Sequence, residues 1–224
     1  MSSEDIVNFQ SSKLGTKEYW DDCYELENEN FDDHGEEGEV WFGEEAGERM
    51  VDWLEERCQE GELSESSPVL DVGCGNGLLT VSLCQAGWTN VTGVDYSSGA
   101  VELATKIASQ YECTATFQTM DLLDNDLVSS NFGGQFRIIV DKGTFDAVSL
   151  SEGSTTEKQK YVESLAVMLE AEGLFLITSC NWTETELSTH FASHFSLLET
   201  VPTPTFTFGG RTGKTTTFCI FQKK

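Results

Sequence analysis

Glycines and aspartates in the first half of the chain follow two short apolar runs at a spacing that suits a nucleoside. The first run, at 69–72, contains Asp71 and leads into three glycines spaced by two residues: Gly73, Gly75 and Gly77. The second run, at 91–94, ends on Asp95. Glycine lets a backbone approach a ligand closely, and an acid about 20 residues further on suits a ribose diol. The pattern predicts an adenosine-containing ligand at the ends of two strands.

The residues around the glycines favour one ligand. Dinucleotide sites use G-x-G-x-x-G, which places helix N–H groups against a pyrophosphate, whereas these glycines are spaced by two. Asp71 would repel phosphate but suits an ammonium and a sulfonium, and Leu78 and Leu79 stand where a P-loop would carry its lysine. We therefore expect S-adenosylmethionine, with S-adenosylhomocysteine as product. Taken alone, the glycine loop could be only a tight turn.

Further cofactor-binding candidates lie beside these positions. Cys74 is inside the glycine loop, and Tyr96 is expected to pack along the ribose. Asp121 can accept from the adenine amino group while the N–H of Leu122 meets a ring nitrogen. Trp41 and Phe42 form an aromatic patch that could close over the cofactor. The acids could instead be helix caps or turn residues, and the aromatic patch could simply pack an N-terminal helix onto the sheet.

A second group of candidates for catalysis follows two later apolar runs. Asp141 ends the run at 136–140 and is expected near the sulfonium methyl, where it could hold a lysine ammonium or take its proton. Asp146 follows in the same D-K-G-T-F-D segment and is as easily a turn residue. After the run at 174–178, Asn181 could offer a carbonyl to a lysine and Trp182 could wall its stem, although Trp182 could equally be a core residue. The chain lacks the N-P-P-[FY] tetrapeptide of enzymes that methylate base or amide nitrogens.

The charge is strongly acidic and unevenly distributed. The 224 residues carry a net charge of −26, and residues 1–65 alone hold 22 acidic and 4 basic residues. Such a chain repels nucleic acid and could attract a basic protein, although acids also simply keep proteins soluble.

The cysteines and the hydropathy indicate a cytoplasmic protein. Seven cysteines are scattered without metal-ligand spacing, which predicts free thiols, no disulfide framework and no metal. No long apolar run predicts a membrane span, and the acidic N-terminus does not resemble a signal peptide. A monomer is the default expectation.

The apolar runs alternate with helical patterns from residue 68 onward, which predicts an α/β, doubly wound, mostly parallel sheet with ligand at the strand ends. We expect a flexible tail at 1–16, an acidic helical arm or lid at 17–67 and a catalytic domain at 68–224. Strands are expected at 69–72, 91–94, 114–118, 136–140, 174–178, 195–199 and 215–221. Helices are expected at 17–30, 44–60, 77–87, 98–111, 156–169 and 183–194. The last two strands could be joined through a hairpin-like loop around Gly209-Gly210, which suggests an antiparallel edge.

The chain resembles the seven-β-strand, class I methyltransferases, and among them the small eukaryotic enzymes that methylate a lysine of translation elongation factor 1-alpha. The resemblance covers nearly the whole chain. It rests on SKLGTKEYWDDCYE, GEVWFGEE (38–45), VLDVGCGNG (69–77), VTGVDYS (91–97), VDKGTFDAVSL (140–150), LFLITSCNWT (174–183) and PTPTFTFGGRTG (202–213). It implies a Rossmann-like fold, S-adenosylmethionine as donor, a lysine as acceptor, cytosolic action and a basic protein substrate. The residues themselves leave open a small-molecule methyltransferase and a catalytically silent, cofactor-binding adaptor.

Overall fold

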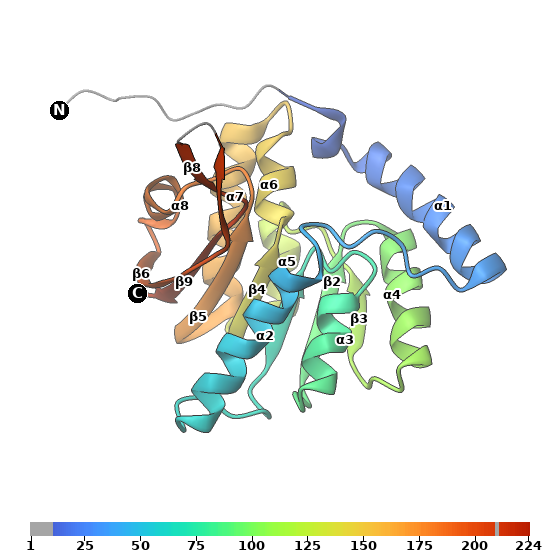
Figure 1. Ribbon diagram of the computed structural model, residues 1–224, viewed down its shortest axis with the longest axis horizontal. Coiled ribbons are helices and arrows are strands. Elements are labelled where there is room, and N and C mark those ends of the chain that lie inside the picture. Colours follow the sequence, from blue (N-terminus) through green and yellow to red (C-terminus); the bar gives the residue numbers. More distant parts are fainter. Residues whose placement is uncertain (1–10, 209–210) are drawn as a thin grey trace.

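A seven-stranded sheet forms the centre of the protein, whose computed structural model describes residues 11–208 and 211–224 (Figure 1). The strand order is β3-β2-β1-β4-β5-β9-β6. The strands are β1 (Val69–Val72), β2 (Val91–Asp95), β3 (Thr116–Thr119), β4 (Phe136–Lys142), β5 (Leu169–Ser179), β6 (Phe195–Val201) and β9 (Thr217–Lys223). The first five strands in this order, β3, β2, β1, β4 and β5, pair in parallel. Strand β9 is antiparallel to both β5 and β6. The predicted doubly wound, mostly parallel sheet with antiparallel pairing at its edge is confirmed.

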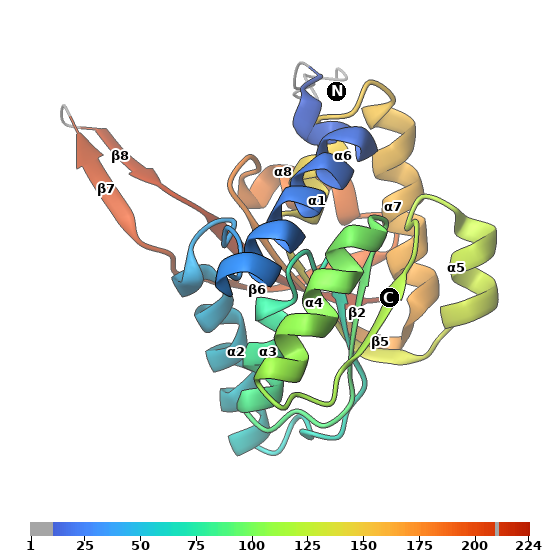
Figure 2. The same ribbon diagram turned by 90° about the vertical axis from the view of Figure 1, so that its right-hand side faces the viewer.

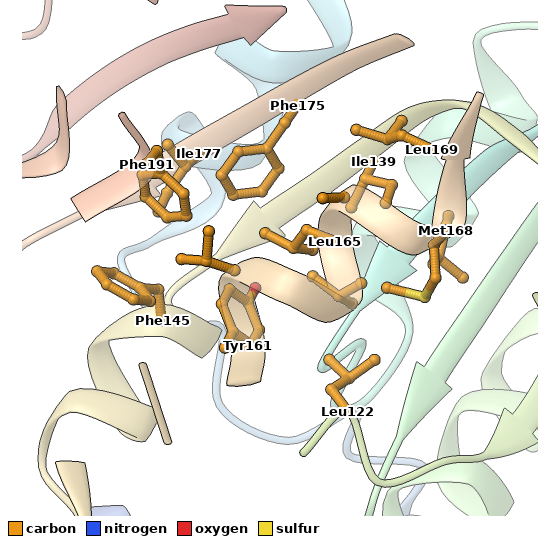
Figure 3. Packing of buried hydrophobic residues seen from close by; sticks show 14 of the residues in the cluster. Leu122, Ile139, Phe145, Tyr161, Leu165, Met168, Leu169, Phe175, Ile177 and Phe191 are labelled. Carbon is orange, nitrogen blue, oxygen red and sulfur yellow. The ribbon is translucent and has the colours of Figure 1, made fainter. Parts of the chain in front are cut away.

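Alternation along the strands divides the core into two layers, because successive side chains of a strand point to opposite faces. Ile139, Phe175 and Ile177 face one layer, while Ile138 and Leu176 face the other. Figure 3 shows the first layer, in which rings and aliphatic chains of the sheet meet those of the covering helices. Both faces of the central strands are therefore buried, which explains their continuous apolar runs.

The helices are distributed between these two faces. One face is covered by α5 (Asn125–Phe132), α6 (Thr144–Ser149), α7 (Ser154–Met168) and α8 (Glu184–Phe191). The other is covered by α2 (Glu44–Gln59) and α3 (Leu78–Gln85), and next to them α4 (Ser98–Gln110) packs with α1 (Lys17–His34). Thus the predicted arm contributes one helix to the sheet's own core and lays the other along α4 (Figure 2).

Two helices and a two-stranded ribbon were not anticipated. The segment 122–135, which carries no clear pattern, contains α5, and the D-K-G-T segment continues into the short α6. Between β6 and β9 the chain forms a separate antiparallel ribbon of β7 (Thr205–Phe208) and β8 (Arg211–Lys214), which projects away from the body (Figure 2). The predicted turn at Gly209-Gly210 lies outside the described residues.

Part of the expected tail is held against the domain. Residues 1–10 lie outside the described chain, but Lys13–Gly15 form a 3-10 helix, η1. The backbone N–H of Ser12 donates to the carbonyl of Leu150 at 2.9 Å, and a Cβ on Gly15 would collide with the backbone of Leu150. The chain therefore crosses the end of α6 before α1 begins.

The expectation of free thiols is wrong for one pair. Cys84 at the end of α3 and Cys113 after α4 form a disulfide, with their Cα atoms 5.9 Å apart. Their spacing of 29 residues has no motif, and they meet only because α3 and the approach to β3 lie side by side in the fold. Of the helices in the described ranges, none is long and apolar enough to cross a membrane.

Candidate active site

The glycine loop after β1 is fixed by the strands beside it. Gly73 and Gly75 adopt positive φ of 61° and 55°, and a Cβ on Gly73 would collide with the side chain of Thr144. The N–H of Gly75 donates to Oδ2 of Asp95 at 3.1 Å, and the N–H of Ser97 donates to Oδ1 at 2.9 Å. The second strand's acid therefore holds the loop in place and lies beside it.

A cavity of about 270 Å³, the main cavity below, opens at the carboxyl ends of β1, β2 and β4. Ten of the predicted site residues line it: Trp41, Phe42, Gly73, Cys74, Gly75, Asp95, Tyr96, Asp121, Leu122 and Asn181. Residues far apart in the sequence thus meet at one edge of the sheet, as parallel topology requires. The structure adds lining residues that the motifs did not single out, among them Trp20, Tyr24 and Met120.

The N-terminal arm closes one side of this cavity. The ring of Trp41 lies edge-on to that of Trp20, with centroids 5.0 Å apart. The ring of Phe42 packs so closely on Gly143 that a Cβ there would lie 2.9 Å from it. Asn76 of the glycine loop donates to the carbonyl of Glu37 at 2.9 Å, which ties the arm to the loop. The aromatic patch therefore both packs the arm and walls the cavity.

Asp71 does not line the main cavity but lines a second cavity next to it. Its Oδ2 accepts from Oγ1 of Thr80 at 2.8 Å, and burial raises its pKa to about 6 while Thr80 and the charge of Lys142 oppose that rise. It lines a second cavity of about 230 Å³ that shares Gly73, Cys74, Asn76 and Lys142 with the main one. The glycine loop therefore separates Asp71 from the main cavity, and Asp71 can act on a ligand there through that loop.

Asp95 and Tyr96 are the acid and ring at the end of β2. Burial raises the pKa of Asp95 to about 6, against the lowering effect of the N–H groups of Ser97 and Gly75. Asp121 uses Oδ1 to accept from the N–H of Leu123 at 2.8 Å and is exposed at the cavity edge. Leu122 is buried behind it. The spatial order of these residues is compatible with a ribose near β2 and an adenine near β3.

Besides Asp71, three predicted site residues lie away from the main cavity, which corrects the sequence-based assignment. Gly77 packs against α4, where a Cβ would lie 2.7 Å from that of Ala104. Trp182 is 2% exposed and its ring lies 5.8 Å from that of Phe145, in the core. Asp141 is fully buried. The sequence could place these residues near a strand end but not the direction of their side chains.

Asp141 has a structural arrangement of hydrogen bonds. Its Oδ1 accepts from the N–H of Thr144 at 2.7 Å, and its Oδ2 accepts from the N–H of Phe145 at 3.0 Å and from the hydroxyl of Tyr161 at 2.6 Å. These donors start α6 and tie it to α7. Burial raises the pKa of Asp141 to about 7, despite the opposing bond from Tyr161. The expected contact with a substrate lysine does not fit this geometry.

Asp146, five residues later, occupies the position that Asp141 was expected to fill. It lines the main cavity and is 4% exposed. Its Oδ1 accepts from the N–H of Asn181 at 2.8 Å and from Oγ of Ser179 at 3.0 Å. The segments after β4 and β5 therefore meet through this carboxylate. The D-K-G-T-F-D pattern thus contains the acid that lines the cavity, but sequence spacing alone favoured the first acid.

Comparison with known proteins identifies the class. Residues 63–217 match the family described as methyltransferase domain, and the chain belongs to this methyltransferase family. It is 43% identical to human "EEF1A lysine methyltransferase 2" over 96% of this chain and 89% of the relative. It is 44% identical to "Protein-lysine N-methyltransferase efm4" of Schizosaccharomyces pombe, with 94% of both chains covered. A structure of the N-methyltransferase NodS from Bradyrhizobium japonicum, in complex with S-adenosyl-L-homocysteine, matches with a TM-score of 0.57 and 17% identity over 79% of this chain and 87% of that one.

The cofactor is S-adenosylmethionine, and the main cavity fits it. The carboxylates of Asp95 and Asp121 are present in the wall, and the glycine loop leaves room for close backbone approach. Lys142 is the one cation among the described lining residues, and its Nζ already donates to the carbonyl of Trp41 at 2.9 Å. Such a wall suits a cationic adenosyl compound better than a phosphate. When bound, the cofactor supplies an electrophilic methyl group.

Proposed function

We propose that this protein transfers a methyl group from S-adenosylmethionine to a lysine ε-amino group of translation elongation factor 1-alpha. The observation that carries the proposal is the near-full-length identity, 43–44%, to relatives named as lysine methyltransferases of that factor or as protein-lysine N-methyltransferases. The main cavity supports it because carboxylates and an amide, rather than bases, surround its mouth.

The charge of the chain supports a basic protein as substrate. The arm contributes Glu39 to the main cavity, and the second cavity has Glu37, Glu44 and Glu48 along its wall. Opposite charges of substrate and enzyme accelerate their encounter and fix its orientation. The same charge disfavours direct binding of nucleic acid.

We further propose that Trp41 and Phe42, as part of the arm at 17–67, form a lid over the cofactor bound by the domain at 68–224. Gly73, Cys74, Gly75, Asp95, Tyr96, Asp121 and Leu122 would hold the cofactor, with Asp71 acting through the glycine loop, and Asn181 would face the substrate. The protein would act as a cytoplasmic monomer, which light scattering and cell fractionation can test.

Radiolabelled donor tests the function directly. The purified protein is incubated with the donor and purified elongation factor 1-alpha, and in parallel with a cell lysate. One labelled protein band of the factor's size, with a methylated lysine found by mass spectrometry, would support the proposal. Label only in small molecules would favour a small-molecule methyltransferase. No label, with S-adenosylhomocysteine still bound in calorimetry, would favour a silent adaptor.

A further inference from the structure

Asp146 has one carboxylate oxygen that the protein uses and one that it leaves free. Oδ1 accepts from the N–H of Asn181 and the hydroxyl of Ser179, and the thiol of Cys180 lies 3.6 Å from it. Oδ2 is buried and has no hydrogen-bond partner within the described chain. The side chain is therefore oriented by one oxygen, while the other remains available.

A buried carboxylate oxygen without a partner is energetically costly. Groups of this kind are rare in folded proteins, and a ligand-binding role is one of the explanations for them. No salt bridge of the described residues includes Asp146. Burial raises its pKa to about 6, against the lowering effect of Ser179 and Asn181, so the carboxylate is still mostly charged at pH 7.5. The carboxylate of Asp146 is therefore a buried negative charge to which the described residues supply no positively charged partner.

The surroundings of Asp146 indicate which cation would fit. The wall of the main cavity contains, besides Asp146, the apolar side chains of Ala147, Val148 and Leu150 from the same segment and the ring of Phe42 from the arm. An aliphatic stem can pack along such a wall while its charged end reaches a carboxylate. A lysine side chain has this shape, with an apolar chain of four carbons and a terminal ammonium.

We propose that Oδ2 of Asp146 accepts a hydrogen bond from the ε-ammonium of the acceptor lysine and so holds it at the main cavity. This inference rests on the proposed lysine methyltransferase function and assigns the residue that binds the acceptor. Ser179 and Asn181 are then positioning residues, because they fix Oδ1 and thereby aim Oδ2. The role expected of Asp141 passes to an acid five residues further along the chain.

The variant Asp146→Asn tests the proposal with little change in shape. The amide oxygen can keep the bonds from Ser179 and Asn181, and only the free oxygen becomes an N–H donor. We expect the KM for elongation factor 1-alpha to rise about 10- to 100-fold, as for loss of a hydrogen bond to a charged group. Affinity for S-adenosylhomocysteine, measured by calorimetry, should stay within about twofold of wild type, because Asp146 is assigned here to the acceptor lysine.

A binding experiment separates the lysine contact from general effects. The affinity of elongation factor 1-alpha for the protein loaded with S-adenosylhomocysteine is measured with the natural factor and with a factor whose acceptor lysine is replaced by methionine. Asp146→Asn should weaken binding of the natural factor by at least about tenfold and leave binding of the methionine variant unchanged. Asp126→Asn, the same change on the exposed face of α5, serves as the control and should affect neither.

The outcomes distinguish this inference from the proposed function. If the wild-type protein does not methylate the factor, the proposed function fails. If the wild type is active and Asp146→Asn has a normal KM, or loses cofactor affinity to the same extent, the assignment of Asp146 is wrong. Should Asp146→Asn not fold, Ser179→Ala removes one orienting bond, and it should raise the KM about two- to fivefold with cofactor affinity unchanged. An unchanged KM in that variant would also overturn the assignment.

Discussion

The Nζ atom of Lys142, at the end of β4, donates a hydrogen bond to the backbone carbonyl of Trp41 at 2.9 Å. This contact joins the sheet to the N-terminal arm across 101 residues of sequence. Lys142 is largely buried, and burial lowers its pKa while the charges of Asp71 and Asp141 oppose that change. One side chain therefore fixes the arm over the glycine loop and partly neutralises the acids beneath it.

Replacing Lys142 by methionine should loosen the arm. The variant keeps the length of the side chain but loses the bond to Trp41, and it leaves Asp71 without its nearby positive charge. We expect the affinity for S-adenosylhomocysteine to fall about five- to tenfold and amide hydrogen exchange of residues 37–43 to become faster. Lys160→Met, on the exposed face of α7, should change neither measurement. Unchanged exchange at 37–43 would show that other contacts hold the arm.

Gly73→Ala should destabilise the protein because the new methyl group has no space. The residue has a positive φ of 61°, and its Cβ would collide with the side chain of Thr144. Strain and overpacking together are expected to lower the free energy of unfolding by about 2–5 kcal/mol. Gly134 has a similar φ of 64° but no atom within 4 Å of an added Cβ. Gly134→Ala should therefore cost only about 1–2 kcal/mol, and equal losses in chemical denaturation would contradict the steric explanation.

The free energy of unfolding should fall as the pH rises through the range where the buried aspartates ionise. Burial raises the pKa of Asp141 to about 7 and that of Asp71, Asp95 and Asp146 to about 6. An unfolded aspartate titrates near 3.9, so between these values the folded protein binds more protons than the unfolded chain and loses stability as the pH increases. His190 acts in the opposite sense below pH 6.5, because burial lowers its pKa to about 4.

Urea denaturation at pH 5 and pH 8 measures this effect. We expect the free energy of unfolding to be lower at pH 8 by at least about 2 kcal/mol. Asp141→Asn should reduce the difference, since it removes the carboxyl whose pKa is raised most. A protein that is as stable or more stable at pH 8 would show that the buried acids do not govern the dependence.

The disulfide between Cys84 and Cys113 should make stability depend on reductant. It closes a loop of about 30 residues, for which the loss of chain entropy predicts a stabilisation of about 3–4 kcal/mol. Thermal unfolding with and without dithiothreitol should differ, and the Cys84→Ser/Cys113→Ser double variant should be insensitive to reductant. Because the cytosol is reducing, mass spectrometry after alkylation of protein from cells would show whether the bond forms there. Identical melting with and without reductant would contradict a structural role.

The order of elements and most of the residues that line the main cavity could be predicted from the sequence. The run at 174–177, Leu-Phe-Leu-Ile, has no polar residue on either face, and this property by itself requires burial between two layers of helices. Asp71, the glycines and Asp95 are close in sequence to the strands that carry them, so their meeting at one edge follows from parallel topology alone. Local pattern was thus sufficient for the sheet and the glycine loop.

The tertiary structure decided what depends on side-chain direction and on distant contacts. Asp141 and Asp146 are both acids after β4, and only the packing of α6 shows that the first starts the helix while the second reaches the cavity. The contact of Lys142 with Trp41 and the pairing of Cys84 with Cys113 join segments whose separation carries no local signal. Sequence periodicity records which residues must be buried, because burial acts on each residue separately. It does not record which buried groups become partners, because that choice depends on how all the elements pack together.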